Sequence, residues 1–374
     1  MNFVGIDLHT NKFTCCYRDE ASSTEDPKKA RVIETFALDA EGLKLFYRTL
    51  TAETYVLVEA TITTFSFVRL FKDRVKQVMI ANTYELKQVS LARCNTDKID
   101  ADKLCRILKA QVLSGEQLVS PVISPPVEIQ ELRGLFSTYR LFKKQNTQIK
   151  NRIHSLLKEQ LHGFTQEEIF GKRDRQEIRA ISPGSSMHFQ VNLLLDRLER
   201  DEADVKLLQD KILLHAAPFM TQIDILTSMK GISVFIAIAI IADIIDVSRF
   251  RNSKAFTSYL RSAPRMSNSN MTTSNRGTNK MGRKLAATLL VYSLNHVLDA
   301  SSKLNRWYDR LCQYKKPGIV RTGLRRRVFA EIYQMLKKGE YHYYRDTIKH
   351  DIKMAQYRLF LGKAKNNEIL KITA

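Results

Sequence analysis

Two long runs of apolar residues, spaced alternately by three and four positions, constrain this chain more than any other feature. Such spacing places side chains along one seam of an α-helix, as at the a and d positions of a coiled coil. The segment Ser182–Ser185 contains a proline and a glycine and breaks the helical pattern between the runs. We therefore expect a central antiparallel coiled coil, with pairing to another subunit or two ordinary amphipathic helices as the alternatives. The seam positions are Leu132, Leu135, Tyr139, Phe142, Asn146, Ile149, Ile153 and Leu156, then Val191, Leu194, Leu198, Asp201, Val205, Leu208 and Ile212.

The region before these runs has the pattern of an α/β layer structure. Strands are expected at 3–8, 13–17, 32–37, 55–58 and 75–80, and helices at 41–50 and 65–72. Strands that come first and then alternate with helices indicate a sheet covered by helices. Pro121, Pro125 and Pro126 mark its end, because proline cannot continue a ladder or a helix interior.

The region after the second run is expected to be mainly α-helical. Gly231 lies between two apolar segments and predicts a helix, a tight turn and a second helix. Such a hairpin can present backbone N–H groups to a phosphate, although glycine turns between packed helices are also common. The expected fold class is α/β plus α. Its three regions are 1–120, 121–217 and 218–374.

The charge of the chain indicates a polyanionic partner. It has 374 residues with 60 Lys and Arg against 39 Asp and Glu, a formal net charge of +21. Because these cations are spread along the whole chain, nucleic acid is favoured over a membrane surface. The most apolar run, 232–245, contains Asp243 and is shorter than the roughly 18–20 residues that cross a bilayer. The five cysteines form no CxxC pair, which indicates reduced thiols.

Four carboxylates are candidate metal ligands. Asp7 interrupts the first apolar strand, where an unpaired charge is costly, and Glu59 directly follows a second one. Asp97 and Asp100 are three positions apart, so on a helix they share a face. Carboxylates that converge need divalent cations, and oxygen ligands suit Mg²⁺ or Mn²⁺, which support phosphodiester chemistry. The structural alternative makes Asp97 a helix N-cap, and Asp102 is a nearby carboxylate on another face of the helix.

These motifs resemble those of the DEDD insertion-sequence transposases, a family of bridge-RNA-guided serine recombinases related to the pilin-gene DNA invertases. The family's opening strand is similar to Val4–Asp7, its second acid to Val58–Thr61 and its paired aspartates to Thr96–Ala101. Further matches are the coiled-coil helix at 132–153, the glycine hairpin at Lys230–Ser233, and the segments at 243–250, 259–260 and 263–264. The resemblance implies a RuvC-like domain of RNase H fold over 1–120. It also implies a helical coiled-coil region over 121–217 and a transposase domain with a helix-hairpin-helix-like segment over 218–374. Asp7, Glu59, Asp97 and Asp100 are then the catalytic metal ligands.

The resemblance also implies a nucleophilic serine at Ser269, after the Ala-Pro segment, with help from the metal because no histidine is near in sequence. Ser267 is a rival, because Asn270 stands where the family has glycine; Ser233 and Asn95 are further departures. Without the resemblance, residues 267–274 are expected to form a solvated polar loop. The candidate nucleic-acid-binding residues are Gly231, Arg249, Arg265, Arg276, Lys280 and Arg283.

The sequence thus predicts a transposase that cuts and rejoins insertion-sequence DNA by Mg²⁺-assisted or Mn²⁺-assisted serine attack. Expected partners are donor and target DNA, a non-coding guide RNA and further copies of the chain in a dimer or tetramer, with no membrane. The expected location is the bacterial cytoplasm, with binding to the nucleoid. The alternatives are a DNA invertase of the same family and a RuvC-like nuclease without serine chemistry. For RNA, stacking candidates lie within Tyr341–Lys349, although tyrosines on the buried face of a helix give the same pattern.

Overall fold

The computed structural model describes residues 1–21, 31–89, 96–159, 170–181, 183–269 and 272–372, without the side chains of 87–89, 265–276, 365 and 367–372. The chain divides into two compact units, Met1–Pro125 and Pro126–Ala374. The boundary falls at the prolines that the sequence marks. The long helices and the C-terminal region share the second unit.

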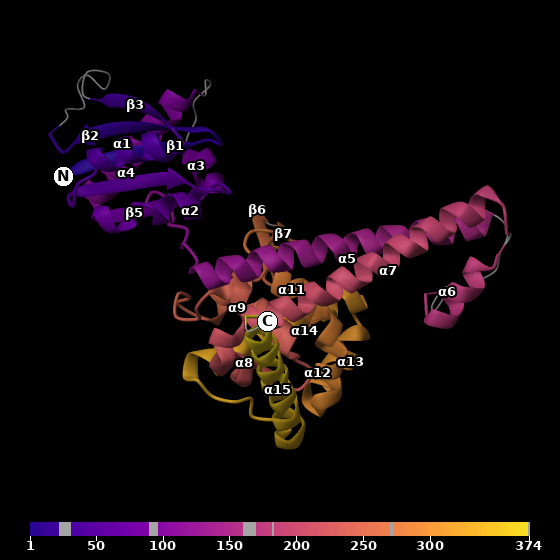
Figure 1. The fold of residues 1–374 in the computed structure, drawn as a ribbon. Coiled ribbons are helices and arrows are strands. Elements are labelled where there is room, and N and C mark those ends of the chain that lie inside the picture. The colour runs from indigo at the N-terminus through magenta and orange to yellow at the C-terminus, as the bar shows by residue number, and fades with distance from the viewer. Residues whose placement is uncertain (22–30, 90–95, 160–169, 182, 270–271, 373–374) are drawn as a thin grey trace. The chain divides into compact units, whose positions relative to one another are not determined.

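The first unit is built on one mixed five-stranded sheet (Figure 1). Its strands are β1 (Asn2–Leu8), β2 (Lys12–Asp19), β3 (Val32–Ala37), β4 (Thr54–Glu59) and β5 (Gln77–Ala81), in the order β3-β2-β1-β4-β5. β2 is antiparallel to β1 and β3, whereas β4 is parallel to β1 and β5. A mixed sheet with a central β1 fits the expected RNase H-like domain.

Alternation along β1 sends successive side chains to opposite faces of the sheet. Val4, Ile6 and Leu8 pack with the aromatic cluster on one face, where Phe46 and Phe67 are buried. The helices on that side are α1 (Ala40–Thr49) and α2 (Thr64–Arg69), with a short 3₁₀ turn η1 (Lys72–Arg74). The opposite face is covered by α4 (Asp97–Ser114), and α3 (Thr83–Val89) follows β5. Asp7 belongs to this second face.

Gly5 lets α4 lie directly on β1. A Cβ atom at this position would stand 2.2 Å from the backbone nitrogen of Cys105 and 2.3 Å from the carbonyl oxygen of Ala101. Only glycine permits so close an approach of helix and strand backbones. The contact fixes the start of α4 near the end of β1.

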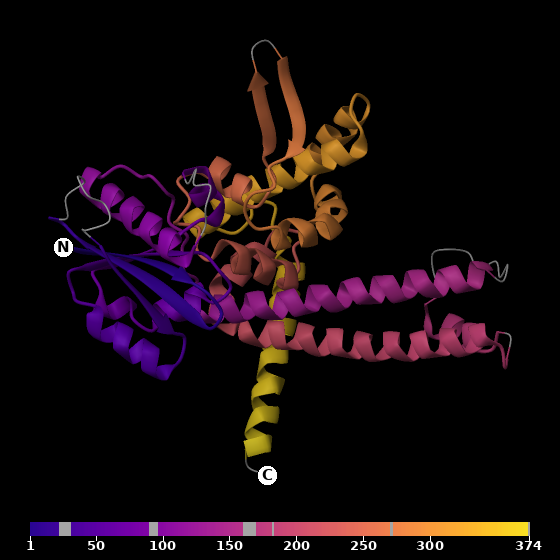
Figure 2. The same cartoon turned by 90° about the horizontal axis from the view of Figure 1, so that it is seen from above.

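The second unit contains a long helical hairpin formed by α5 (Val127–Glu159) and α7 (Ser186–His215), with the short α6 (Lys172–Arg179) between them in sequence. The two long helices lie side by side and antiparallel (Figure 2), with Lys150 paired to Glu202 at 3.5 Å. Asn146 and Asp201, the polar members of the two seams, are both buried. In the amide orientation that satisfies both groups, Asn146 donates to Asp201 Oδ2 at 3.3 Å. The two heptad runs therefore lie on two long helices of one chain that pack against each other.

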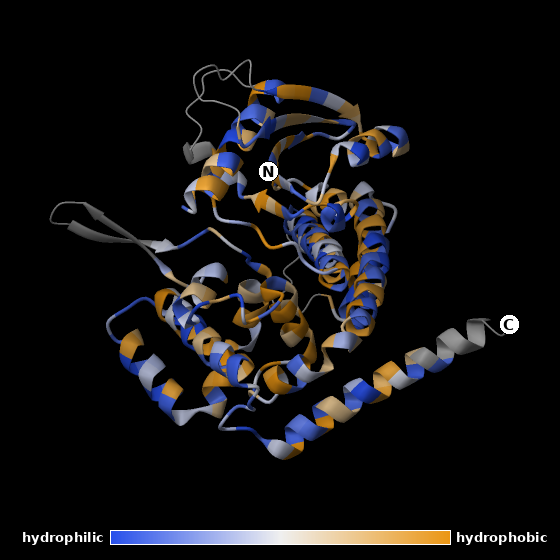
Figure 3. Ribbon diagram, turned by 90° about the vertical axis from the view of Figure 1, so that its left-hand side faces the viewer, coloured by the Kyte–Doolittle hydropathy of each residue, from blue (hydrophilic) through white to orange (hydrophobic). Residues whose placement is uncertain are grey.

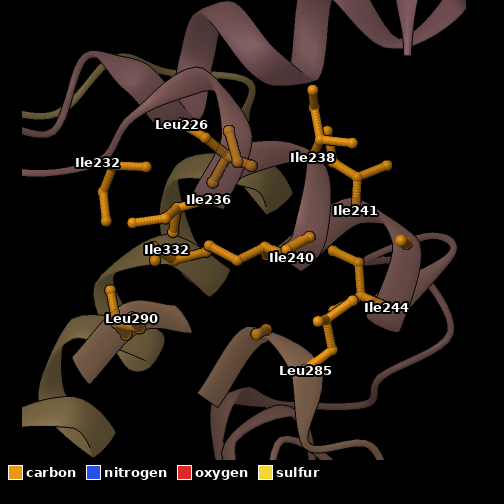
Figure 4. Close-up of a cluster of buried hydrophobic side chains, with 14 of the residues drawn as sticks. Leu226, Ile232, Ile236, Ile238, Ile240, Ile241, Ile244, Leu285, Leu290 and Ile332 are labelled. Carbon is orange, nitrogen blue, oxygen red and sulfur yellow. The ribbon is translucent and has the colours of Figure 1, made fainter. Parts of the chain in front are cut away.

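The rest of the second unit packs around α9 (Val234–Ile244), which is apolar except for the buried Asp243 and contributes several side chains to the core drawn in Figure 4. The surrounding elements are η2 (Ala217–Phe219), α8 (Met220–Thr227), α10 (Ser253–Tyr259), α11 (Leu285–Leu290), η3 (Val291–Ser293), α12 (Leu294–Ala300), α13 (Ser302–Cys312), α14 (Pro317–Lys338) and α15 (Thr347–Ile372). Hydrophilic and hydrophobic residues mix along α15 (Figure 3), which buries Met354 and Tyr357 in this core. Across the described part of the chain, every helix is too short or too polar to cross a membrane.

A β-hairpin replaces the polar loop expected at 267–274. β6 (Pro264–Ser269) and β7 (Thr272–Thr278) are antiparallel, with Ser267 opposite Ser274 and Ser269 opposite Thr272. The loop expectation was wrong because backbone hydrogen bonds hold a strand pair without apolar alternation, and β-branched threonines favour extended backbone.

Candidate metal centre and nucleic-acid interface

Asp7 and Asp97 come together around His9, beyond the carboxyl end of β1. His9 Nε2 lies 3.1 Å from Asp7 Oδ2 and 3.2 Å from Asp97 Oδ1. One ligand atom from each of the three residues lies within 4.8 Å of the others. Among the described residues, no other three His, Cys, Asp or Glu side chains meet this spacing. The cluster is therefore the strongest candidate for a metal centre.

Local structure explains how the two acids meet. Asp7 follows Phe3 and Gly5 on the face of β1 that α4 covers, so its side chain points toward the start of that helix. Thr96 is the N-cap of α4, with its side-chain oxygen accepting from the Ile99 N–H at 3.4 Å, and Asp97 begins the helix. The alternative that Asp97 is the N-cap is therefore wrong. An acid in the first turn of a helix is stabilised by the positive end of the helix dipole.

Asp100 and Glu59 border the same cluster. Asp100 lies one turn along α4 from Asp97, and its carboxylate accepts from Lys103 Nζ at 2.8 Å. Glu59 ends β4, one position after the parallel pair Ile6 and Val58. Register and alternation therefore place Glu59 beside Asp7 in the sheet, on the face that α4 covers.

The electrostatics of the cluster favour an added cation. Burial raises the pKa of the Asp7 carboxyl, His9 lowers it, and the charges of Asp100 and Asp97 raise it further. The net direction is upward, so the ionised form of Asp7 is disfavoured until positive charge is supplied. Lys12 Nζ lies 2.6 Å from Asp97 Oδ2, and this hydrogen bond holds the pKa of Asp97 below its ordinary value.

The donor set fits a divalent cation. Carboxylate oxygens suit Mg²⁺ and Mn²⁺, and an imidazole nitrogen is an acceptable further ligand for Mn²⁺. His9 Nε2 faces Asp7 Oδ2 and Asp97 Oδ1. A cation bound between the two carboxylates would be coordinated by these two oxygen atoms. The sequence interpretation missed His9 and Lys12 as neighbours of these acids. Their places at the two sides of the turn between β1 and β2 were the signal that could have identified them.

Asp102 is a structural carboxylate. It is buried and pairs with Arg18 at 2.7 Å, Arg31 at 2.9 Å and Arg106 at 2.8 Å. Although burial raises the pKa of Asp102, its hydrogen bond and attraction to Arg18 and the charge of Arg106 outweigh burial and lower it. A carboxylate with three guanidinium partners has no need of a metal ion.

The turn at Gly231 has the helix, turn and helix order that the sequence predicts, between α8 and α9. Gly231 has a φ of 93°, and a Cβ atom there would stand 3.0 Å from the Val297 backbone nitrogen. Ser233 caps α9 by accepting from the Ile236 N–H at 3.2 Å. Lys353 donates to the Thr227 and Ile232 carbonyl oxygens at 3.0 and 2.7 Å. Gly231 thus has a packing role in this turn.

The other candidate nucleic-acid residues differ in their surroundings. Arg283 Nε pairs with the buried Asp243 at 3.0 Å, and the Arg249 guanidinium lies 4.6 Å from the centroid of the Tyr259 ring. Both arginines therefore support the fold, whereas Lys280 is exposed. The side chains of Arg265, Ser267, Ser269 and Arg276, and the residues Asn95 and Asn270, lie outside the described part of the structure.

Comparison with known families matches both units. Residues 4–161 match a family model of DEDD transposases of the IS110 type, described as "Transposase". Residues 223–309 match a second model, described as "Transposase IS116/IS110/IS902 family". No curated protein matches the chain. The first match contains Asp7, Glu59, Asp97 and Asp100, and the second contains the Gly231 turn and the β-hairpin with Ser269.

Proposed function

Because the chain is a DNA transposase of the IS110 family, we propose that it cuts and rejoins insertion-sequence DNA by serine attack. In this proposal Asp7, Glu59, Asp97 and Asp100 hold Mg²⁺, or Mn²⁺ in its place. The observation that carries it is the meeting of Asp7, His9 and Asp97 within 4.8 Å at the end of a buried strand. Family membership supports divalent metal use, and the donor set supports a hard cation.

The metal would supply positive charge for the non-bridging oxygens and for the oxygen atoms that enter and leave phosphorus. Asp7 and Asp97 hold that charge in place, and Asp100 and Glu59 add negative charge around it. Lys12 and His9 orient the Asp97 carboxylate through contacts of 2.6 and 3.2 Å. Orientation of this kind lowers the entropic cost of reaching the reactive geometry.

Ser269 is the proposed nucleophile. Its Oγ forms a bond to phosphorus while a deoxyribose oxygen leaves, so the energy of the phosphodiester is kept in a phosphoserine ester. A hydroxyl group of the second DNA strand then displaces the serine and restores a phosphodiester. The antiparallel pairing in β6 and β7 supports this proposal, because a hairpin gives Ser269 a fixed position on the backbone.

The nucleophile and the metal ligands belong to different units of the chain. We propose that they meet in a homo-oligomer, a dimer or tetramer, in which α5 and α7 form a coiled coil. The turn at Gly231 acts as a helix-hairpin-helix that binds DNA phosphates, with Lys280, Arg265 and Arg276 as further contacts. A non-coding RNA is the proposed guide. The charge of +21 supports binding to two nucleic acids at once.

The test is a search for the covalent intermediate. Wild-type protein is incubated with Mg²⁺, RNA transcribed from the element's own non-coding ends, and end-labelled DNA spanning the element junction, and denaturing gels then separate the products. We expect a protease-sensitive protein–DNA adduct with wild type and none with Ser269→Ala. Ser267→Ala is the matched control and should keep the adduct.

Other outcomes would revise the proposal. An adduct that persists in Ser269→Ala and disappears in Ser267→Ala would move the nucleophile by two residues. Free cleavage products with every variant, without any adduct, would contradict serine chemistry and leave a metal-dependent nuclease. Asp7→Asn should abolish both the adduct and free cleavage.

A further inference from the structure

The second unit also contains a large groove, whose lining includes Lys230 but no other residue of the turn segment Lys230–Ser233. Its volume is about 1230 Å³, and its walls are contributed by α12, α13, α14 and the segment 340–344 that follows α14. The cationic side chains that line it are Lys230, Lys303, Arg306, Arg310, Arg327 and Lys338, against the two acids Glu331 and Glu340. A concave surface with this excess of positive charge attracts an anionic chain.

The cations on α13 form a stripe along the groove. Lys303, Arg306 and Arg310 follow one another at steps of three and four, so they share one side of the helix. All three side chains are exposed, and no residue of α13 is fully buried. Three cations in line along one helix suit a ligand with regularly spaced negative charges, such as a phosphodiester backbone. They suit a ligand with one negative charge less well.

Aromatic rings lie among these cations. Trp307 lines the groove, and the Arg327 guanidinium lies 4.2 Å from the centroid of its ring. Tyr343 is 90% exposed and Tyr344 is 58% exposed, and their ring centroids are 5.0 Å apart at an angle of 90°. Exposure of large aromatic rings to water is unfavourable, and clusters of such rings on a surface often mark a binding site.

The tyrosine segment is held in place rather than loosely attached. The Tyr341 hydroxyl donates to Asp224 Oδ2 at 2.8 Å, and the His342 backbone N–H donates to Ser228 Oγ at 2.9 Å. These bonds tie the segment to α8 and leave Tyr343 and Tyr344 exposed. The alternative that tyrosines in this segment lie on the buried face of a helix is therefore wrong, because residues 341–344 precede α15 and three of these tyrosines are exposed.

We infer that this groove binds an unpaired stretch of nucleic acid, with phosphates along the α13 stripe and bases stacked on Tyr343 and Tyr344. Duplex DNA hides its base faces, so it would use the cations but not the rings. Single strands use both, through a positive groove and stacking on aromatic side chains. An acidic peptide would use the charge alone.

The inference rests on the proposed function for its biological setting, because a recombinase meets unpaired strands either in a guide RNA or in separated DNA. The chemistry is shared by both sources, apart from the 2′-hydroxyl of RNA. The binding test below requires no strand exchange, so it can fail or succeed independently of the serine adduct.

The test measures binding of labelled oligonucleotides to the full-length protein by fluorescence anisotropy. The probes are an RNA strand, a DNA strand and a DNA duplex of one mixed sequence, about 16 nucleotides long, the upper end of common site sizes for single strands. Tyr343→Ala should weaken single-strand binding by about fivefold or more, the contribution of one stacked base, and leave duplex binding unchanged. Tyr343→Phe should bind like wild type, because it keeps the ring.

Matched controls lie elsewhere on the same unit. Tyr314 is 79% exposed and does not line the groove, so Tyr314→Ala should bind like wild type. Arg310→Ala should reduce the dependence of log K on log salt for single strands by about 0.7, the value for one phosphate contact, whereas the exposed Lys143 changed to alanine should not.

Three results would overturn the inference. They are equal losses in Tyr343→Ala and Tyr314→Ala, a parallel loss of duplex binding in Tyr343→Ala, or competition by polyglutamate as strong as competition by RNA. Tighter binding of RNA than of DNA would assign the groove to a guide RNA, and equal or tighter binding of DNA would assign it to a separated DNA strand; both support the inference.

Discussion

Two carboxylate clusters involve the first two turns of α4, one around the buried Asp102 and one around the half-buried Asp7, and they differ in how their charge is balanced. Asp102 has three guanidinium groups within 2.9 Å, and its pKa is lowered. Asp7 shares one imidazole with Asp97 and lies near the charge of Asp100, and its pKa is raised. The first cluster is complete without a ligand. In the second cluster Lys12 pairs with Asp97 and Lys103 with Asp100, so the carboxylate that lacks positive charge is Asp7. A carboxylate in that state is expected in a metal centre.

The largest expected effect comes from removing charge at the second cluster. Asp7→Asn should slow DNA strand exchange by about a thousandfold, because several kcal/mol of transition-state stabilisation depend on the bound cation. The folded protein should be as stable as wild type or more so, since ionisation of the half-buried Asp7 carboxyl is unfavourable without a cation. The rate of adduct formation measures the effect on activity, and urea denaturation measures the effect on stability. Equal activity of Asp7→Asn and wild type would contradict a metal-binding role for the Asp7 cluster.

The opposite pattern is expected at the first cluster. Asp102→Asn should lower the free energy of unfolding by about 3–5 kcal/mol, because it breaks the buried ion pair between Asp102 and the Arg18 guanidinium. Urea denaturation measures this loss. The activity of the folded fraction should be retained.

The pH dependence of this difference has a definite sign. Because the pKa of Asp102 is lowered in the folded state, its stabilisation is present above the unfolded pKa and is lost as pH falls through the folded value. The stability gap between wild type and Asp102→Asn should therefore narrow below about pH 4. A gap that widens on acidification would contradict the assignment.

A substitution in the strand beneath α4 should disturb both clusters. Gly5→Ala places a Cβ atom against Cys105 and Ala101, so α4 must move away from β1 at a cost of about 1–3 kcal/mol. Activity should fall together with stability, because a shift of α4 moves Asp97 away from Asp7. Ala81→Gly, a change of the same size in β5, is the control and should not reduce the activity of the folded fraction.

The smallest expected effect concerns the buried polar pair in the helical hairpin. Asn146→Leu should destabilise the protein by about 1–3 kcal/mol, because Asp201 loses a hydrogen-bond donor. Adding Asp201→Leu should recover stability, since an apolar pair replaces a buried charge. Thermal denaturation checks both variants, and the exposed Lys144 changed to leucine serves as control. A double variant that is less stable than Asn146→Leu alone would contradict this account, because the Asp201 carboxylate would then stabilise the hairpin without Asn146.

The sequence predicted features that depend on periodicity and missed those that depend on three-dimensional approach. Heptad spacing predicted two long helices with Asn146 and Asp201 on their seams, and the structure adds that these two residues meet. The apolar runs predicted the strands that carry Asp7 and Glu59, and the structure adds that these strands are neighbours. His9 and Lys12 contact Asp7 and Asp97 because of the turn between β1 and β2. The periodicity of the sequence does not predict the geometry of that turn. The β-hairpin at 264–278 has polar residues throughout, so it lacked the apolar alternation by which strands are recognised.

The central claim is that Asp7 and Asp97 hold a divalent cation, and direct binding tests it without any DNA. Isothermal titration calorimetry with Mn²⁺ should give a saturable site in the wild-type protein that is lost in both Asp7→Asn and Asp97→Asn. Glu41→Gln, at an exposed position on α1, should bind like wild type. Binding of Mn²⁺ that is equal in all four proteins would contradict the account, because the acids at the end of β1 would then be dispensable for metal.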